Sequence, residues 1–222
     1  MKSMILSGML LASTVVSGTV VISQHFESDE VGSGAKWTRM YYNAESYAGV
    51  SDEAHSLLPE NNKHGFKVYK ATNTKNGWMH LSFPKQTGAL KISFDFMAEN
   101  NLRFIFDVFS EWKTHISLEL NRNVLSNMAS RSDRYKLADI VPRSWYRIAI
   151  EINKPLNKAE DFTIEVKSLD PKNEFYSKVE NMIFYNIKGS GEDFINRIKI
   201  TTWPGKALFL DNLTVDSIEE QK

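Results

Sequence analysis

The sequence contains no cysteine, and its charges cancel. Without cysteine, the chain cannot form disulfides, use a thiol nucleophile or bind zinc through thiolates. Its 27 lysines and arginines balance 27 aspartates and glutamates, so the formal net charge is zero. Proteins that bind nucleic acids or anionic membranes usually carry excess positive charge. We therefore expect no nucleic-acid partner, and the balance favours a neutral partner or none.

Motifs of several common enzyme classes are also missing. The five histidines show no His-x-x-x-His or His-x-His spacing, so a zinc site has no support. The chain has neither a Gly-x-Ser-x-Gly segment, which would present a serine nucleophile, nor a phosphate-binding loop. Among the histidines, only His115, close to Glu119 in the sequence, is placed for an acid–base role.

Apolar residues form a single long run, at the N-terminus. Residues 4–16 are mostly apolar, follow Lys2 and precede the small residues Ser17 and Gly18. This arrangement predicts a secretory signal peptide, residues 1–18, cleaved near Gly18 and Thr19. A first core strand or helix is the alternative, whereas a transmembrane anchor is disfavoured because the run is short and polar residues follow it. We expect a secreted or periplasmic protein with no membrane partner after cleavage.

Residues 90–122 alternate apolar and polar side chains with the period of a β-strand that buries one face. The apolar positions of the first two segments are Leu90, Ile92, Phe94, Phe96, Leu102, Phe104, Phe106 and Val108. Asn100 and Asn101 indicate a turn between these segments, and a third alternating segment covers residues 115–122. The pattern predicts three consecutive strands.

Short strand patterns separated by turn residues continue along the rest of the chain. Residues 145–153 alternate most regularly, and we expect hairpins in residues 65–83 and 197–215. The length of 222 residues, 42% of them hydrophobic, suits one domain. The prediction is an all-β fold, a two-sheet antiparallel jelly-roll sandwich that spans residues 19–222 as a single domain.

Three segments together resemble the concanavalin A-like lectin/glucanase jelly rolls. They are Phe26-Glu27 followed by Trp37, residues 145–152, and residues 208–215 with the sequence Leu-Phe-Leu-Asp-Asn-Leu-Thr-Val. The last segment is also similar to the final strand of carbohydrate-binding modules with a galactose-binding-like sandwich. The resemblance implies a concanavalin A-like sandwich that is exported and meets a polysaccharide or glycan, as a binding module or as a hydrolase or lyase.

The sequence departs from the catalytic members of these families. It lacks the paired-glutamate motif Glu-x-Asp-x-(x)-Glu of the β-glucanases. It also lacks the arginine-rich and Gln-x-His strands of the alginate lyases. An enzyme activity therefore stays open, and binding without catalysis is favoured.

The polar positions of the central segments form the candidate site. If the apolar residues face the core, then Asp95, Arg103, Asp107, His115 and Glu119 share the opposite face. Neighbouring strands lie about 4.8 Å apart, so these carboxylates would stand roughly 5–10 Å apart, a range used in glycoside hydrolysis. Three interpretations are open, namely a solvated outer face, a sugar-binding face, or a catalytic pair.

Aromatic side chains are the second candidate feature. Sugars present flat faces of C–H groups, and exposed tryptophan or tyrosine offers an apolar platform with a polar edge. Trp112 follows a predicted strand and Tyr47 lies in a long polar segment, so these two are expected to be exposed. Most other aromatic residues are expected in the core.

Asp211 is the third candidate feature. It shares strand parity with Phe209, Leu213 and Val215, so its carboxylate is expected on an apolar face, where it needs a partner. The resemblance implies that an aspartate of the last strand helps to hold a structural calcium, with Glu27 or Asp29 as a second ligand. An arginine, or backbone N–H groups at a β-bulge, are the alternatives.

The sequence thus supports three hypotheses of function. The first is an exported protein that binds a polysaccharide or glycan on a concave sheet face, without catalysis. The second is a glycoside hydrolase or polysaccharide lyase that uses carboxylates or a histidine on the same face. The third is a structural or adhesion protein of the cell envelope.

Overall fold

The computed structural model describes residues 18–27, 29–31, 39–41, 47–53, 56, 63–69, 77–111, 113–130, 132–153, 162–182 and 194–218. These residues form fifteen strands. The strands are β1 (Gly18–Gln24), β2 (Arg39–Tyr41), β3 (Tyr47–Ser51), β4 (Gly65–Tyr69), β5 (Gly77–Gln86), β6 (Ala89–Ala98), β7 (Phe104–Ser110), β8 (Lys113–Asn121), β9 (Val124–Met128), β10 (Arg134–Asp139), β11 (Trp145–Ile152), β12 (Phe162–Ser168), β13 (Tyr176–Met182), β14 (Ile195–Thr202) and β15 (Ala207–Ile218).

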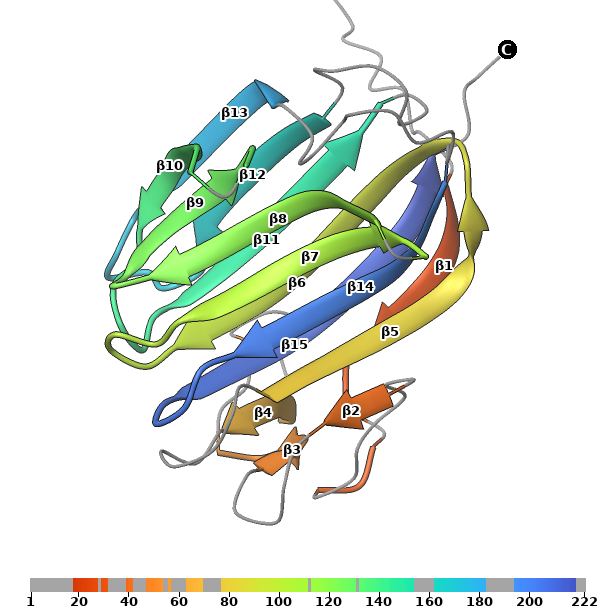
Figure 1. Cartoon of the computed structure of the whole chain (residues 1–222). Helices are drawn as coiled ribbons and strands as arrows, with labels where there is room; N and C mark the ends of the chain where they lie inside the picture. The colour runs from red at the N-terminus through yellow and green to blue at the C-terminus, as the bar shows by residue number, and fades with distance from the viewer. Residues whose placement is uncertain are drawn as a thin grey trace, which may run out of the picture.

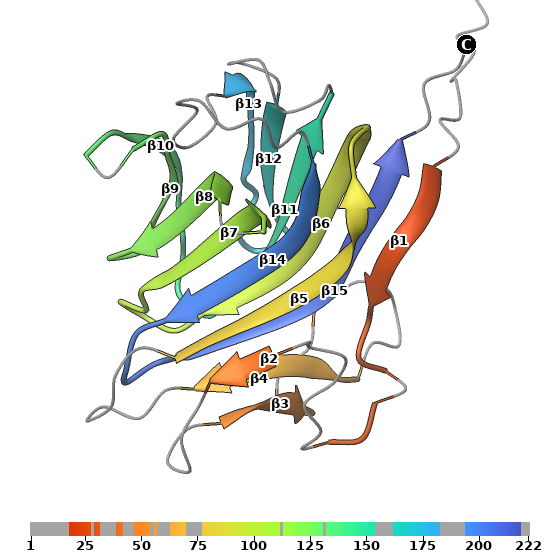
Figure 2. The same cartoon turned by 45° about the vertical axis from the view of Figure 1, so that its right-hand side comes forward.

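The strands form two antiparallel sheets that pack face to face (Figures 1 and 2). Sheet A has the order β13-β12-β11-β6-β15-β4-β3, and β1 also pairs with β15. Sheet B has the order β10-β9-β8-β7-β14-β5-β2. This architecture confirms the predicted all-β, two-sheet antiparallel sandwich of the jelly-roll type. No helix within the described ranges is long and apolar enough to cross a lipid bilayer.

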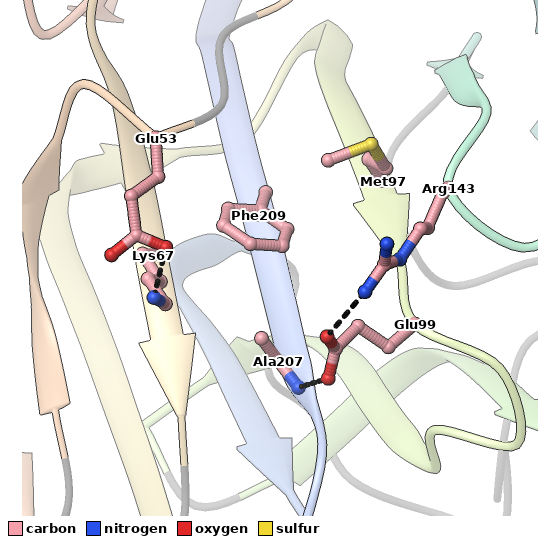
Figure 3. A pocket seen from close by; sticks show the side chains of 7 residues that line it. All are labelled: Glu53, Lys67, Met97, Glu99, Arg143, Ala207 and Phe209. Carbon is pink, nitrogen blue, oxygen red and sulfur yellow. Dashed lines mark hydrogen bonds and ion pairs between the residues drawn. The ribbon is translucent and has the colours of Figure 1, made fainter.

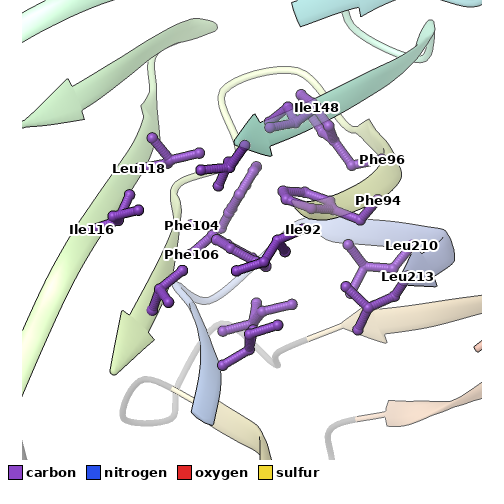
Figure 4. Packing of buried hydrophobic residues seen from close by; sticks show 14 of the residues in the cluster. Ile92, Phe94, Phe96, Phe104, Phe106, Ile116, Leu118, Ile148, Leu210 and Leu213 are labelled. Atoms are coloured by element: carbon purple, nitrogen blue, oxygen red, sulfur yellow. The ribbon is translucent and has the colours of Figure 1, made fainter. Parts of the chain in front are cut away.

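Aromatic and aliphatic side chains from both sheets fill the space between them (Figure 4). Phe94 of β6 stacks on Phe106 of β7, with ring centroids 4.3 Å apart, and Phe96 meets Phe104 edge-on at 5.5 Å. All four rings are at most 1% exposed. Burial of such a side chain stabilises the fold by about 1.5–3 kcal/mol. The alternation in the sequence therefore reports the core-facing side of each strand correctly.

The central segments nevertheless belong to different sheets. β6 lies in sheet A, whereas β7 and β8 lie in sheet B. The predicted turn does form, because Asn101 has a positive φ of 59° and the Leu102 N–H donates to the Glu99 carbonyl over 3.1 Å. This turn carries the chain from one sheet to the other. The prediction that Asp95 shares a face with Asp107 is therefore wrong.

Two other predicted pairings are wrong for the same reason. β4 lies in sheet A and β5 in sheet B, and β14 lies in sheet B and β15 in sheet A. The expected hairpins in residues 65–83 and 197–215 are therefore crossings between sheets. β7 and β8, by contrast, pair directly in sheet B and form a true hairpin.

The predicted signal peptide falls almost entirely outside the described residues, which begin at Gly18. β1 starts at this position and pairs with the last strand, from Gly18 opposite Ile218 to Gln24 opposite Leu213. The boundaries of the signal peptide and of the single domain stay predictions.

Candidate ligand-binding surfaces

Three of the predicted site residues meet on the outer face of sheet B: Arg103, Asp107 and Glu119. Two of them, Arg103 and Glu119, are locked in an ion cluster. Glu119 of β8 is 1% exposed and lies between two arginines. Arg103 donates from Nε to Oε1 over 2.8 Å, and its Nη2 forms an ion pair with the same oxygen at 2.7 Å. Arg134 donates from Nε to Oε2 over 2.8 Å. Arg103 also stacks on the Trp203 ring, 4.1 Å from its centroid. Both oxygens of Glu119 are thus engaged in charge-assisted hydrogen bonds.

Asp107 of β7 has an environment on this face that suits proton transfer. Its side chain is half-buried, and Ser117 Oγ donates to its Oδ1 over 2.6 Å. In the register, Lys199 of β14 stands opposite Asp107. Desolvation raises the pKa of Asp107 to about 6, although the Ser117 hydrogen bond and the Lys199 charge act in the opposite direction. A carboxyl group with this pKa exchanges a proton near neutral pH.

The other predicted residues of this face are less available. His115 is 3% exposed, and its Nε2 forms a 2.6 Å hydrogen bond with Ser110 Oγ. Trp112 lies outside the described residues. Trp78 stacks on His80 of the same strand, with ring centroids 5.4 Å apart. The face is thus polar and aromatic, but most of its charged groups bind one another.

Asp95 lies on the outer face of sheet A, at the centre of a buried polar cluster. The register aligns Arg147 of β11, Asp95 of β6 and Asp211 of β15 in one row. Arg147 donates to both Asp95 oxygens, from Nε over 2.6 Å and from Nη2 over 2.9 Å. Ser56 Oγ and Asn212 Nδ2 donate to Oδ2 over 2.6 and 2.8 Å. The hydrogen bond to Asp95 raises the pKa of Arg147 above its ordinary value.

Asp211 completes this cluster through a β-bulge. The pairing of β15 with β6 shifts between Asp211 and Thr214, and Asn212 adopts a positive φ of 48°. The bulge turns Leu213 into the core while Asp211 faces outward, so the parity argument that placed them on one face is wrong. Asp211 accepts hydrogen bonds from the backbone N–H groups of Asn212 and Ser56, over 2.7 and 3.1 Å. Backbone donors at a bulge were one of the alternatives left open by the sequence.

The predicted calcium ligands both bind N–H groups. Glu27 accepts hydrogen bonds from the backbone N–H groups of Lys63 and His64, over 2.9–3.0 Å. Within the described residues, no cluster of three or more histidine or carboxylate side chains could hold a metal ion. Carbonyl and carboxylate oxygens bind calcium, whereas N–H donors repel it. The N–H donors around Asp211 and Glu27 thus disfavour calcium at these two carboxylates, and calcium binding by the protein stays a prediction.

A pocket of about 460 Å³ opens on the outer face of sheet A, beside this cluster (Figure 3). We call it the Phe209 pocket, after the ring in the middle of its floor. Its lining residues are Glu53, Lys67, Met97, Glu99, Arg143, Ala207 and Phe209. The register aligns Lys67, Phe209 and Met97 across three neighbouring strands. The pocket thus sits directly on the sheet.

The rim of the Phe209 pocket carries two ion pairs, one on each side of the ring (Figure 3). Lys67 pairs with Glu53, and the Lys67 ammonium lies 5.8 Å from the centre of the Phe209 ring. On the other side, Arg143 Nη2 lies 3.5 Å from Glu99 Oε1. Two acids and two bases make the pocket neutral, with an apolar floor and both hydrogen-bond donors and acceptors at its rim.

Sequence reasoning missed all residues that line this pocket. They come from segments far apart in the chain, and only the pairing of β4, β15 and β6 brings them together. The predicted platform residue Tyr47 belongs to β3 of the same sheet, where it pairs with Tyr69, which in turn pairs with Ala207. Phe209 itself carried a signal, because it breaks the alternation of the last strand between two leucines.

Comparisons with known proteins find the fold but not a family. No protein-family model matches the sequence, and no curated protein matches it either. Solved structures that match include a sialidase, with a TM-score of 0.64 and 13% identity over 90% of this chain. This chain corresponds to only 19% of the sialidase chain.

Two further matches cover nearly the whole of both chains. The PL-14 alginate lyase from Aplysia kurodai has a TM-score of 0.57 and 10% identity, covering 90% of this chain and 99% of its own. The catalytic domain of the glycoside hydrolase family 131 protein from Coprinopsis cinerea has a TM-score of 0.56 and 15% identity, covering 92% and 95%. All three proteins are named for activities on carbohydrates. At these identities, the likeness establishes the shared sandwich fold and leaves the concanavalin A-like superfamily itself a resemblance.

Proposed function

We propose that this protein binds a carbohydrate in the Phe209 pocket without cleaving it. The observation that carries the proposal is an apolar floor, made by Phe209 and Met97, beneath a rim of paired charges. A pocket of about 460 Å³ lies in the range of small-ligand sites. The sandwich fold, which is shared with the carbohydrate-active proteins named above, supports a carbohydrate as the ligand.

The chemistry of a sugar suits this arrangement. The C–H face of a sugar ring can lie over the partly buried Met97 and the part of Phe209 that is still exposed, 8% of the residue, which removes apolar surface from water. Sugar hydroxyl groups can donate to Glu53 and Glu99 and accept from Lys67 and Arg143. Hydrogen bonds to charged groups are stronger than those between neutral groups, so the rim fixes the orientation of the ring.

Affinity electrophoresis of the protein tests this proposal. The gels contain laminarin, xyloglucan, galactomannan, alginate or heparin, and at least one polysaccharide is expected to retard the protein. Phe209→Leu removes the ring but keeps an apolar floor, and we expect it to weaken binding about tenfold. Arg143→Ala removes an exposed rim donor, with a similar expected loss.

Arg122→Ala provides a matched control for Arg143→Ala. Both arginines are exposed and have positive φ angles, 51° for Arg122 and 62° for Arg143, but Arg122 does not line the pocket. The control is expected to bind like the wild type. Wild-type binding by both pocket variants, or no retardation in any gel, would overturn the proposal and leave a structural or adhesion role as the better account.

Cleavage of a polysaccharide at Asp107 is a second candidate function. The half-buried carboxyl with its raised pKa favours it, because such a group can act as a general acid. Incubation of the same polysaccharides at pH 6, followed by detection of new reducing ends or unsaturated products, tests this candidate. Products that form with the wild type and vanish with Asp107→Asn would support it, and the absence of products would reject it.

We also propose that the protein works outside the cytoplasm, secreted or periplasmic. The N-terminal run of residues 4–16 supports this location. Expression of the full chain, followed by N-terminal sequencing of the exported protein, tests it. A mature N-terminus near Thr19 is expected, whereas an intact Met1 in the cytoplasmic fraction would reject export.

A further inference from the structure

A second concavity of about 450 Å³ lies on sheet A, at the turn between β12 and β13. We call it the Tyr176 groove. Its lining residues are Lys167, Ser168, Leu169, Asp170, Pro171, Glu174, Phe175 and Tyr176. Tyr176 is 60% exposed, which is unusual for so large an aromatic side chain. The groove thus offers an aromatic platform that the fold itself does not use.

The Tyr176 groove and the Phe209 pocket open on the same face of sheet A. The register places Tyr176, Lys167, Arg147 and Asp95 in one row across four neighbouring strands, and Asp211 of β15 continues it. Phe209 stands on β15, two residues along from Asp211. Four steps between neighbouring strands, at about 4.8 Å each, separate β13 from β15 by ~19 Å. This distance exceeds the size of a single sugar ring and suits a chain of several.

An apolar cluster connects the two concavities. Trp145, Ala207 and Phe209 form its buried part, and the partly buried Met97 and Leu169 pack against it. Met97 lines the Phe209 pocket, and Leu169 lines the Tyr176 groove. The Leu169 N–H donates to the Trp145 carbonyl over 2.8 Å, which holds the groove against the centre of the sheet. The surface between the two sites thus combines this apolar cluster with the charged Arg147 and Lys167 of the neighbouring row.

The charges of the two linings argue against an acidic ligand. Lys67, Arg143 and Lys167 are the cations, and the carboxylates are Glu53, Glu99, Asp170 and Glu174. Acidic polysaccharides are usually bound where cations outnumber carboxylates, because like charges repel. The linings here have no such excess. The chemistry favours a neutral chain whose hydroxyl groups both donate and accept.

We propose that the ligand is an extended neutral polysaccharide that crosses the strands of sheet A, with one sugar in the Phe209 pocket and another on Tyr176. This inference rests on the proposed function, because it takes the Phe209 pocket as a carbohydrate site. It adds a second subsite, the direction of the chain and its neutral character. Affinity then increases with chain length until the chain reaches both subsites.

Isothermal titration with oligosaccharides of two, four and six units, prepared from laminarin, xyloglucan and galactomannan, tests the inference. We expect six units to bind at least about tenfold more tightly than two, because the longer chain gains contact with Tyr176. Tyr176→Ala is expected to abolish this gain and leave binding of the disaccharide unchanged. Tyr176→Phe keeps the aromatic face and is expected to bind like the wild type.

Tyr135→Ala is the matched control, because Tyr135 is 53% exposed but lies on β10 of sheet B. It is expected to leave all affinities unchanged. Equal affinity for two and six units, or wild-type behaviour of Tyr176→Ala, would overturn the second subsite even if Phe209→Leu still weakens binding. Retardation by alginate or heparin alone would overturn the neutral character. If Phe209→Leu has no effect while a polysaccharide still binds, the proposed function itself fails.

Discussion

Each outer face of the sandwich has a polar cluster centred on a buried carboxylate, Asp95 on sheet A and Glu119 on sheet B, and these two carboxylates differ in their partners. On sheet A, Asp95 is 0% exposed and binds the buried Ser56 and Asn212 as well as Arg147. On sheet B, the partners of Glu119 among the described residues are Arg103 and Arg134, whose side chains are 38% and 43% exposed. Asp95 thus ties buried groups together, whereas Glu119 ties groups that can also reach water.

The two clusters also differ in how far apart in the sequence their members lie. The cluster on sheet A joins residues far apart in the chain, because Ser56 is 39 positions and Asn212 is 117 positions from Asp95. The cluster on sheet B joins Glu119 to arginines only 16 and 15 positions away. We infer that the face with the Phe209 pocket is the more rigid one. A rigid sheet is a suitable platform for binding, since little ordering is lost when the ligand arrives.

Removal of Asp95 is expected to have the largest effect. Asp95→Ala leaves the buried Ser56 and Asn212 side chains and the Arg147 charge without their common acceptor. Breaking a buried ion pair in this way costs about 3–5 kcal/mol of unfolding free energy. Urea denaturation monitored by fluorescence measures it. Asp139→Ala, which removes a carboxylate that is 72% exposed, is the control and is expected to cost at most about 1 kcal/mol. A loss below about 1.5 kcal/mol for Asp95→Ala would contradict the comparison.

Removal of Glu119 is expected to cost less, although its side chain is as deeply buried. After Glu119→Ala, the partly exposed Arg103 and Arg134 can turn to water, and Arg103 keeps its contact with Trp203. We expect a loss of about 1–3 kcal/mol in the same denaturation experiment. If Glu119→Ala proves more destabilising than Asp95→Ala, the solvent access of the partners does not decide the cost.

Asp107→Asn is expected to stabilise the protein at neutral pH. The pKa of Asp107 is raised from 3.8 to about 6 in the folded state, so the folded protein binds the proton more tightly than the unfolded chain. The contribution of this carboxyl group to the unfolding free energy is therefore fully present below pH 3.8 and is lost as the pH rises through about 6. The asparagine has no charge to desolvate, and its carbonyl can still accept from Ser117.

The pH dependence of unfolding measures this effect. The unfolding free energy of Asp107→Asn should exceed that of the wild type by ~2 kcal/mol at pH 7, and the difference should vanish near pH 3.5. A difference that does not depend on pH would show that the carboxylate of Asp107 is not destabilised by burial. Ser117→Ala serves as a second probe, because it removes the hydrogen bond that lowers the pKa.

Chelation is expected to have the smallest effect. The carboxylates of Asp211 and Glu27 already accept hydrogen bonds from backbone N–H groups. Thermal unfolding with EDTA and with added calcium should therefore give melting temperatures within about 1 °C of each other. A clear decrease in EDTA that calcium reverses would instead place a structural ion in the protein, as the resemblance of the last strand implies.

The sequence predicted the strands of this fold far better than their partners. The alternation in residues 90–109 correctly identified the buried Phe94, Phe96, Phe104 and Phe106. It did not show that the turn at Asn101 crosses between sheets, because a crossing and a hairpin use the same turn-forming residues. The positive φ of Asn101 is equally suited to both. Sheet membership depends on contacts between distant segments, which the period of a single strand does not contain.

The same limit applies to the candidate site. Arg103, Asp107 and Glu119 do share a face of sheet B. They come from β8 and from β7 or the residue just before it, which are neighbours in sequence and in space. Asp95 was misplaced, and the Phe209 pocket was not found, because both depend on the pairing of β6 with β15, more than a hundred residues later. Local sequence patterns thus identified the polar residues on strands that are neighbours in sequence. They missed those on strands that pair across a long sequence separation.

The bulge in the last strand gives β15 one more residue than its hydrophobic pattern requires. Two residues, Asn212 and Leu213, occupy the space opposite the single Phe94 between the paired positions on β6. Deletion of Asn212 would therefore leave Phe209 outside and Leu213 and Val215 inside, in regular alternation. Conversely, insertion of one residue, Asn212, into a regularly alternating strand would be enough to produce the bulge. The side-chain amide of Asn212 then bonds to Asp95 and His25. With or without this residue, Leu210 and Val215 stay on the core side of the strand.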